Sequence, residues 1–585
     1  MLKLFKQLSK MDFFLAFISL LLIILQVWLD LRLPDYMSEI TMLVQTEGSQ
    51  MSDIYAAGGS MIAVAFASLL TAVVIAVIAA KISANFSANT RERLYDKVQS
   101  FSLEEIKRFS TSSLITRTTN DVTQVQMLIV MGLQVMIKAP IMGVWAITKI
   151  AGKNWEWSAA TAVAVIFLML VVGTAIALAT PKFKILQKLT DRLNAVTREN
   201  ITGLRVIRAY NAEDYQQEKF ENVNEELTNT NLFTSRIMSL LSPTIQLTMN
   251  GLSLAIYWIG AYLINQAGLM ERVTLFSDMI VFSSYAMQVV MSFMMLIMIF
   301  IMVPRANVSA ERILEVLETE PTIIDGTLTT APNDLKGQVE FKHVSFKYPD
   351  AEEYVIQDVS FKANQGETVA FIGSTGSGKS TLVNLVPRLY EATEGEVLVN
   401  DVNVKDYTQE GLRNIMSYVS QKAVLFSGKI KDNIAYGENG RGPVSENDLV
   451  EAVYTAQASD FVEKLPDGYD SHVAQGGTNF SGGQKQRLSI ARAIARRPEI
   501  FIFDDSFSAL DYKTDRALRE ALAKDCPDAT KLIVAQRIGT IQDADKIIVM
   551  DQGRIVGDGT HEELLASNEV YREIAYSQLS EEELA

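Results

Sequence analysis

Six long apolar stretches in the first half of the chain constrain its fold more than any other feature. They run over about 13–33, 59–80, 128–150, 157–179, 243–265 and 277–303. About 20 apolar residues of helix cross the hydrocarbon core of a bilayer, so each stretch is long enough to span it. Buried helices of a soluble protein would not repeat this length so regularly. The pattern predicts an all-α, six-helix transmembrane domain over residues 1–305.

The loops between these stretches differ in charge. Segments 81–124 and 180–236 are rich in Lys and Arg, whereas the loop 34–58 has neither. Because basic loops stay on the cytoplasmic side, both termini are predicted to be cytoplasmic. The two basic loops keep helical periodicity, so four membrane helices are expected to continue into the cytoplasm. Each turn would present a short helix to the soluble part of the chain, with 113–121 and 203–210 as the candidates.

The remainder of the chain has the pattern of a soluble α/β domain. At 585 residues the chain is too long for a single core, which rarely exceeds roughly 250–300 residues. Short strands and frequent charges begin near Gly337. Residues 306–336 are therefore interpreted as a linker and 337–585 as an α/β domain. The net charge of −15 disfavours a nucleic-acid partner, which needs a basic surface.

The strongest motif in this second part is GSTGSGKS at 373–380. It matches the phosphate-loop pattern G-x-x-x-x-G-K-S/T, follows a strand-like run and precedes a helix-like run. The glycines let successive backbone N–H groups curve around phosphate oxygens, and the helix N-terminus adds partial positive charge. Lys379 is predicted to approach the β- and γ-phosphates, and the Ser380 hydroxyl suits a Mg²⁺ ligand. The predicted cradle comprises Gly373, Ser374, Thr375, Gly376, Ser377, Gly378, Lys379, Ser380 and Thr381.

A second strand of the phosphate site is predicted at 500–503. It ends in Asp504, whose carboxylate would hold Mg²⁺ directly or through water. Asp505 follows, at the position of a base or of a carboxylate that positions water. The two motifs together predict a P-loop nucleotidase.

The segment FSGGQKQR at 480–487 narrows this class. Here the chain resembles the ABC transporter superfamily, in particular exporters with fused membrane and nucleotide-binding domains. The resemblance covers essentially the whole chain, because SLITRTTND, GLRVIRAY and the linker RANVSAERILEVLE are also similar. It implies an ABC nucleotide-binding domain over 337–585, with ATP and Mg²⁺ as its ligands and a second half-transporter as its partner.

The resemblance also implies roles for single residues. Tyr348 would stack on adenine, and Gln421 would sense the γ-phosphate and contribute to the Mg²⁺ site. Asp511 would lie in the loop that crosses the dimer interface. The signature that binds the ATP of the opposite subunit would comprise Ser481, Gly482, Gly483 and Gln484.

Two positions depart from the pattern of hydrolytic family members. Asp505 stands where the family normally has Glu, and Gln536 stands where it has His. Asp is shorter by one methylene, which withdraws the carboxylate by roughly 1–1.5 Å, and a misplacement of about 1 Å can lower a rate roughly 100-fold. Gln536 can still donate a hydrogen bond but has no imidazole to carry charge. The two residues are therefore predicted to form a degenerate catalytic pair that allows ATP binding and slow hydrolysis.

The signature FSGGQ is intact beside these altered positions. This combination resembles the degenerate-site half of heterodimeric multidrug exporters of Gram-positive bacteria. The resemblance implies a different partner chain that has Glu and His at the altered positions, with a slow homodimer as the alternative. The expected function is ATP-driven export of drugs or other amphipathic compounds across the bacterial cell membrane. A lipid flippase and a nucleotide-gated channel or regulator are the alternatives.

Two features of the spans are candidates for the substrate cavity. An ionisable residue is expensive in lipid, so Asp30 in the first span either faces a cavity or lies in interfacial water. Lys138, in the third span, is expected to make a structural contact. Methionines recur at helical spacing along one face of the sixth span, which suits varied apolar ligands or packing against helices or lipid. They are Met287, Met291, Met294 and Met298.

Overall fold

The chain forms two compact units. The computed structural model describes residues 2–5, 8–46, 48–332, 334–349 and 351–578. One unit comprises Met1–Gln99 and Ser112–Thr319, and the other comprises Ser100–Thr111 and Glu320–Ala585. A short segment from between the membrane helices, Ser100–Thr111, therefore belongs to the second unit.

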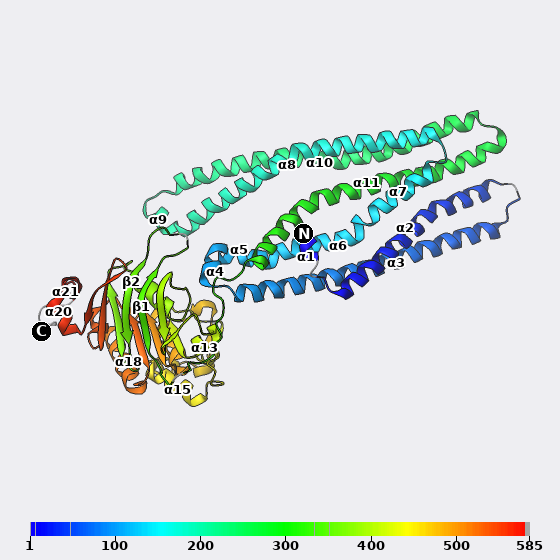
Figure 1. The fold of residues 1–585 in the computed structure, drawn as a ribbon. Helices are drawn as coiled ribbons and strands as arrows, with labels where there is room; N and C mark the ends of the chain where they lie inside the picture. The colour runs from blue at the N-terminus through cyan, green and yellow to red at the C-terminus, as the bar shows by residue number, and fades with distance from the viewer. Residues whose placement is uncertain (1, 6–7, 47, 333, 350, 579–585) are drawn as a thin grey trace. The chain divides into compact units, whose positions relative to one another are not determined.

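The first unit is built from long helices (Figure 1). Within the described residues, six helical segments are long and apolar enough to cross a membrane, and every predicted stretch lies inside one of them. The third of these segments runs over Thr111–Ile150. Helix α2 packs beside α3, and α8 beside α10. The helices are α1 (Leu2–Phe5), α2 (Lys10–Gln45), α3 (Met51–Gln99), α5 (Thr111–Thr116), α6 (Val122–Met131), α7 (Lys138–Ile150), α8 (Trp155–Thr202), α9 (Leu204–Ala209), α10 (Glu213–Gln266) and α11 (Leu269–Glu318).

These helices are longer than a bilayer requires. Helices α3, α8 and α10 have 49, 48 and 54 residues, against the about 20 that cross the hydrocarbon core. This confirms the expected helical extensions. Helix α11 also continues to Glu318, so the first part of the expected linker is helical.

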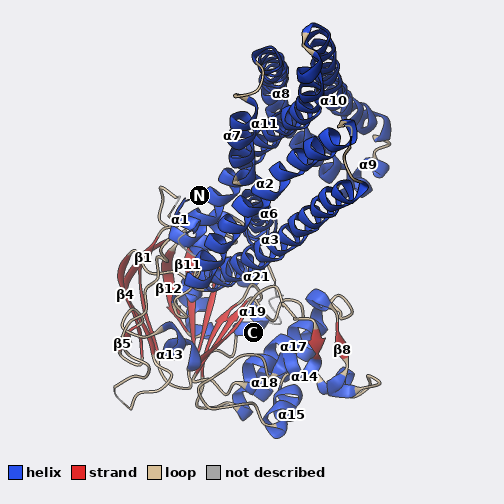
Figure 2. Ribbon diagram, turned by 90° about the vertical axis from the view of Figure 1, so that its right-hand side faces the viewer, coloured by secondary structure: helices blue, strands red, loops and turns tan. Residues whose placement is uncertain are grey.

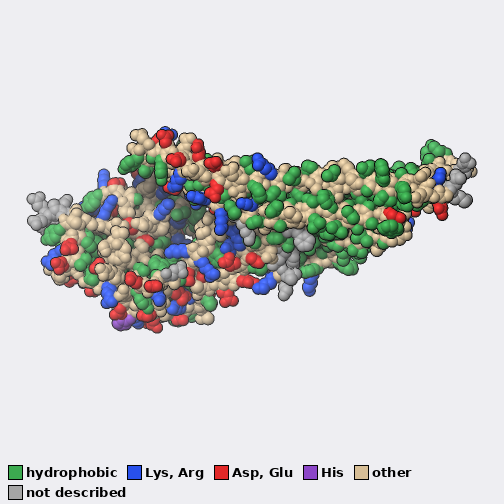
Figure 3. Space-filling view, turned by 90° about the horizontal axis from the view of Figure 1, so that it is seen from above, with side chains coloured by type: hydrophobic (Ala, Val, Ile, Leu, Met, Phe, Trp, Pro, Cys, Tyr) green, Lys and Arg blue, Asp and Glu red, His purple; other side chains and the backbone are tan. Residues whose placement is uncertain are grey.

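Over its membrane segments the first unit is apolar both in its interior and on its surface. Its core includes the buried side chains of Trp157, Phe282 and Tyr285, and the first two rings lie 5.4 Å apart. Figure 3 shows hydrophobic side chains spread over the outside of the long helices as well. A helix that is apolar all round is typical of a membrane span.

The third membrane segment is irregular. Its backbone widens to π-helical turns at Arg117–Asp121 and Gly132–Met136. Pro140 follows the second turn, and its ring lacks an N–H and collides with the carbonyl four residues earlier in a regular helix. The π-helical turn accommodates this proline next to Lys138.

The short helix of the first basic loop lies earlier than predicted. It is α4 (Leu103–Phe109), whereas 113–121 continues as α5 and the first π-helical turn into α6. Ser102 and Glu105 form a capping box that starts α4, and Ser110, with φ of 58°, ends it. The chain thus turns at Ser110, and the prediction of 113–121 was wrong. In the second loop α9 coincides with the predicted 203–210.

The second unit contains two main sheets, whose strands are red in Figure 2. A six-stranded sheet has the order β12-β11-β3-β10-β9-β6, parallel except for β12, and an antiparallel sheet has the order β2-β1-β4-β5. The strands are β1 (Val339–Phe346), β2 (Ile356–Ala363), β3 (Thr368–Gly373), β4 (Glu394–Val399), β5 (Val402–Asn403), β6 (Met416–Val419), β9 (Ile500–Asp504), β10 (Thr530–Val534), β11 (Lys546–Asp551) and β12 (Arg554–Gly559), with a separate pair β7 (Gly428–Lys429) and β8 (His472–Val473).

Helices cover the parallel sheet, as expected for strands that are buried on both faces. Every residue of β9 and β10 is buried. The helices are α12 (Lys379–Leu385), α13 (Gln409–Asn414), α14 (Ile430–Ile434), α15 (Glu446–Thr455), α16 (Ser459–Val462), α17 (Gly482–Ala495), α18 (Tyr512–Asp525), α19 (Ile538–Ile541), α20 (His561–Ser567) and α21 (Glu569–Tyr576). The predicted class, six membrane helices and an α/β P-loop domain, is confirmed.

Candidate nucleotide-binding site

The phosphate loop connects β3 to α12 at the carboxyl edge of the parallel sheet. Gly376 and Gly378 have φ of 89° and 95°, which an L-residue with a side chain rarely adopts. A Cβ at Gly373 would collide with the carbonyl oxygen of Met550. Glycine is therefore favoured at all three positions, of which the motif specifies 373 and 378, and the loop keeps the open backbone that a phosphate group needs.

Lys379 lies folded back into this loop. Its Nζ donates to the carbonyl oxygens of Gly373 and Ser374 at 2.8 and 2.7 Å, and to Ser377 Oγ at 3.3 Å. Among the described residues no carboxylate lies within 4.0 Å of this buried ammonium group. Burial lowers the pKa of Lys379, an effect that the charges of Asp505 and Asp504 oppose. A buried cation without an ion-pair partner fits an anionic ligand such as a triphosphate.

Asp504 lies at the end of β9 and faces the start of α12. Ser380 Oγ donates to its Oδ1 at 2.6 Å, and the Tyr418 hydroxyl donates to its Oδ2 at 3.0 Å. A serine hydroxyl beside a carboxylate supplies the hard oxygen ligands that Mg²⁺ prefers. Ser380 and Asp504 therefore fit the predicted cation, which would neutralise phosphate charge at this position.

The two altered positions meet at one carboxylate oxygen. Asp505 Oδ2 accepts hydrogen bonds from Gln421 Nε2 at 2.7 Å and from Gln536 Nε2 at 2.8 Å. Asp505 is buried, whereas both glutamines are exposed. Burial, together with the charge of Asp504, raises the pKa of Asp505. Gln421 thus contacts the predicted base, and no hydrogen bond joins it to Asp504 among the described residues.

The signature forms the start of α17. Ser481 is the N-cap: its Oγ accepts from Gln484 N at 3.3 Å, and Ser481 N donates to Gln484 Oε1 at 2.9 Å. Ser481 and Gly482 are exposed, and a Cβ at Gly482 would meet open space. This helix N-terminus can accept an anion from outside the chain. Asp511 caps α18 by accepting from Thr514 N at 3.0 Å.

Tyr348 lies beside the phosphate loop. Its hydroxyl is hydrogen-bonded to Thr381 Oγ1 at 3.0 Å, and its ring meets that of Tyr390 edge to face. Lys107 of α4 places its Nζ 4.7 Å from the Tyr348 ring centroid and 5.1 Å from that of Tyr390. The predicted adenine-stacking residue therefore contacts a helix that the sequence analysis did not identify.

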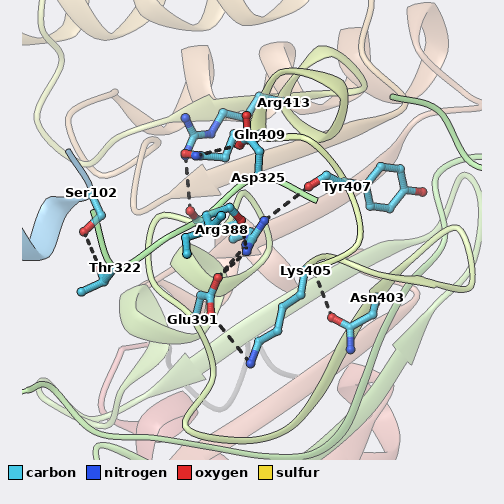
Figure 4. Close-up of polar contacts among 11 residues, drawn as sticks. Ser102, Thr322, Asp325, Arg388, Glu391, Asn403, Lys405, Tyr407, Gln409 and Arg413 are labelled. Carbon is cyan, nitrogen blue, oxygen red and sulfur yellow. Dashed lines mark hydrogen bonds and ion pairs between the residues drawn. The ribbon is translucent and has the colours of Figure 1, made fainter. Parts of the chain in front are cut away.

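Arg388 anchors the turn after α12. Its guanidinium donates to Glu391 Oε1 at 2.8 Å through Nε, to Tyr407 O at 3.3 Å and to Ile324 O at 2.8 Å (Figure 4). These bonds connect the segment after α11 to the helix that carries Lys379. The same group of polar contacts includes Ser102, Thr322, Asp325, Asn403, Lys405, Gln409 and Arg413.

Gln578 contacts the segment that carries Gln536. It donates to Gln536 O at 2.7 Å and accepts from Ile538 N at 2.9 Å. Sequence reasoning found neither this residue nor Tyr418, because their partners lie 40 or more residues away along the chain. For Arg388, Tyr418 and Gln578 the sequence carries no recognisable signal.

The candidate cavity residues of the first unit differ in their polar contacts and in how far they are exposed. Asp30 forms an ion pair with Lys138 at 3.0 Å and accepts from Ser68 Oγ at 2.5 Å. Its charge is thus balanced inside the helix bundle, and Lys138 makes the expected structural contact. Met291 and Met298 expose 43% and 50% of their surface, whereas Met294 packs against the core and Met287 is half-buried.

Comparisons with known proteins agree with this architecture. Residues 16–293 match the family model of the ABC transporter transmembrane region, and residues 356–508 match that of the ABC transporter. The chain is 39% identical over 547 residues to an uncharacterised ABC transporter ATP-binding protein of Mycobacterium tuberculosis, covering 93% of both chains. It is 38% identical over 494 residues to another such protein of Bacillus subtilis, covering 84% of both.

Two further matches concern a named activity and a solved structure. An ATP-dependent lipid A-core flippase of Pseudomonas fluorescens is 32% identical over 481 residues, which cover 82% of this chain and 78% of the flippase. The structure of a bacterial Atm1-family ABC exporter with ATP bound superposes with a TM-score of 0.78 at 23% identity, covering 96% of this chain and 98% of that one. At this identity the structural match supports the fold alone.

Proposed function

The chain belongs to the ABC transporter family, as an exporter-type half with fused membrane and nucleotide-binding domains, and on that premise we propose that it is the weakly hydrolysing half of a heterodimer. It is a multi-pass membrane protein whose ABC domain couples ATP hydrolysis to transport. The proposed complex exports drugs or other amphipathic compounds across a bacterial cell membrane. Both termini of this half are cytoplasmic.

The geometry of Asp505 carries the proposal. A general base needs a lone pair aimed at the attacking water. Here one carboxylate oxygen already accepts two amide N–H groups, from Gln421 and Gln536. Gln536 is neutral, so it cannot pass a proton or carry charge as an imidazolium does. This arrangement supports ATP binding with slow hydrolysis at the chain's own phosphate loop.

The remaining residues of the site support tight nucleotide binding. Lys379 and the loop N–H groups would bind the β- and γ-phosphates, and Ser380 with Asp504 would hold Mg²⁺. In the proposed head-to-tail pair, each ATP lies between the phosphate loop of one chain and the signature of the other. The exposed N-terminus of α17 then completes the competent site of the partner chain.

Unequal effects of substitutions in the two sites test the heterodimer. In the purified complex, Asp505→Asn should lower the ATPase rate only modestly, because a carboxylate already engaged by two amides contributes little to water activation. Ser481→Arg or Gly482→Asp should lower the rate about 100- to 1,000-fold, the usual effect of losing a donor to developing charge. Equal silencing by Asp505→Asn and by the signature changes would contradict the proposal and favour a homodimer.

A lipid flippase is the second candidate. The named activity of the Pseudomonas fluorescens relative, at 32% identity, favours it. The two candidate functions are distinguished by measuring the transport of a fluorescent lipid and of a cationic dye by the same reconstituted complex. Movement of the lipid without the dye would replace drug export by lipid flipping and leave the ATPase assignment in place.

A further inference from the structure

Tyr418 occupies the strand next to the Asp504 strand. It lies in β6, which runs parallel to β9, and it is in register with Ile502, two residues before Asp504. Its ring is partly buried against the hydrophobic core of the domain, while its hydroxyl extends to Asp504 Oδ2 at 3.0 Å. The phenol thus spans from a packed strand to the predicted cation site.

The Tyr418 hydroxyl completes the hydrogen bonding of the Asp504 carboxylate. Oδ1 accepts from Ser380 Oγ at 2.6 Å, and within the described residues the only hydrogen bond at Oδ2 comes from Tyr418. Because the two donors lie on different elements, α12 and β6, they fix both the position and the rotation of the carboxylate. When a cation engages Ser380, Tyr418 remains as the donor that orients Asp504.

The chemistry of the two groups fixes the direction of this hydrogen bond. An ionised carboxylate can only accept, and the phenol supplies the single O–H of the contact. It faces Asp504 with its O–H, and the carboxylate keeps its remaining lone pairs for a cation.

We propose that Tyr418 is a positioning residue for Mg²⁺ binding, acting through Asp504. The inference rests on the proposed function in one respect, that ATP binds here together with Mg²⁺. Partners that hold a metal ligand in place typically contribute 10- to 100-fold to metal affinity. The proposal gives the degenerate site a residue that strengthens nucleotide retention without adding a base.

Photolabelling with 8-azido-ATP tests the proposal in the full-length complex, because gel separation reports the label on each chain. In Tyr418→Phe the Mg²⁺ concentration for half-maximal labelling of this chain should rise about 10-fold or more. Labelling in EDTA should match the unmodified protein, because the phosphate loop is untouched. Tyr418→Leu, which also lacks the hydroxyl, should show the same shift. The labelling of Lys379→Ala gives the background signal of a site that does not bind the nucleotide.

Tyr407→Phe is the matched control. Tyr407 is buried in the same domain, and its hydroxyl donates to Val399 O at 3.0 Å, away from Asp504. This variant should keep the original Mg²⁺ dependence. The proposed role of Tyr418 would be overturned if both Tyr418 variants kept the original Mg²⁺ midpoint, or if they lost labelling equally with and without Mg²⁺. Either result would leave the proposed function in place. No gain from Mg²⁺ in the unmodified chain would overturn the proposed Mg²⁺–ATP binding as well.

Discussion

Asp505 is held by two amide donors that meet at one of its oxygens. A side chain longer by one methylene at this position would move its carboxylate away from the present contacts with Gln421 and Gln536. A histidine at 536 would replace a neutral donor with a group that can be charged near neutral pH. The two altered positions therefore act as a pair, and single changes are expected to be weaker than the double change.

Restoring both residues tests this coupling. Asp505→Glu with Gln536→His should raise hydrolysis at this chain's site by about 10-fold or more, within the roughly 100-fold that a misplacement of about 1 Å can cost. Single-turnover hydrolysis is measured with the partner's phosphate loop inactivated, so that only this site contributes. Gln536→Ala serves as the control for loss of the amide alone. A double variant no faster than the unmodified protein would contradict the assignment of slow hydrolysis to these residues.

Elements with local signals were predictable, and those set by distant contacts were not. The phosphate loop, the Asp504 strand and the signature helix each carry a motif whose residues are adjacent in sequence. The short helix α4 also had a local signal, the capping box formed by Ser102 and Glu105. The prediction nevertheless placed the short helix at 113–121, which belongs to the helical segment that follows α4. Tyr418 is a strand residue whose partner lies 86 positions away, so no local pattern indicates its contact with Asp504.

Two ion pairs join α2 and α7, Asp30 with Lys138 and Asp35 with Lys149, and the first is the more buried. The Asp30 and Lys138 side chains expose only 20% and 17% of their surface. Asp30→Asn should leave the Lys138 ammonium unpaired and cost on the order of 2–3 kcal/mol, below the about 3–5 kcal/mol of a fully buried pair. Adding Lys138→Met should recover most of the loss. Thermal unfolding of the protein in nanodiscs measures both effects.

The exposed pair of Lys219 and Glu199 provides the control for this measurement. Their side chains expose 36% and 59%, so Glu199→Gln should change stability by less than about 1 kcal/mol. Unchanged stability of Asp30→Asn together with reduced transport of cationic compounds would instead favour a cavity-facing carboxylate. That result would support the prediction that Asp30 lines the substrate cavity.

On the scale of the whole molecule, the proposed orientation of the chain in the membrane rests on the charge of the segments between its apolar stretches. The segment 34–58, which joins the first two spans, lacks Lys and Arg, whereas the segments 81–124 and 180–236 are rich in them. With six spans, this asymmetry supports the proposal that the first of these segments faces outward and the other two inward.

The single cysteine makes this orientation directly measurable. Cys526 is the only thiol of the chain and is partly buried, so Cys526→Ala gives a background without cysteine. In that background Gln50→Cys should react with a membrane-impermeant maleimide in intact cells, because position 50 is exposed between α2 and α3. Asp214→Cys, exposed at the start of α10, should react only in inverted membrane vesicles. Labelling of position 214 in intact cells, with position 50 protected, would reverse the proposed orientation and place the ATP-binding domain on the side of the membrane that lacks ATP.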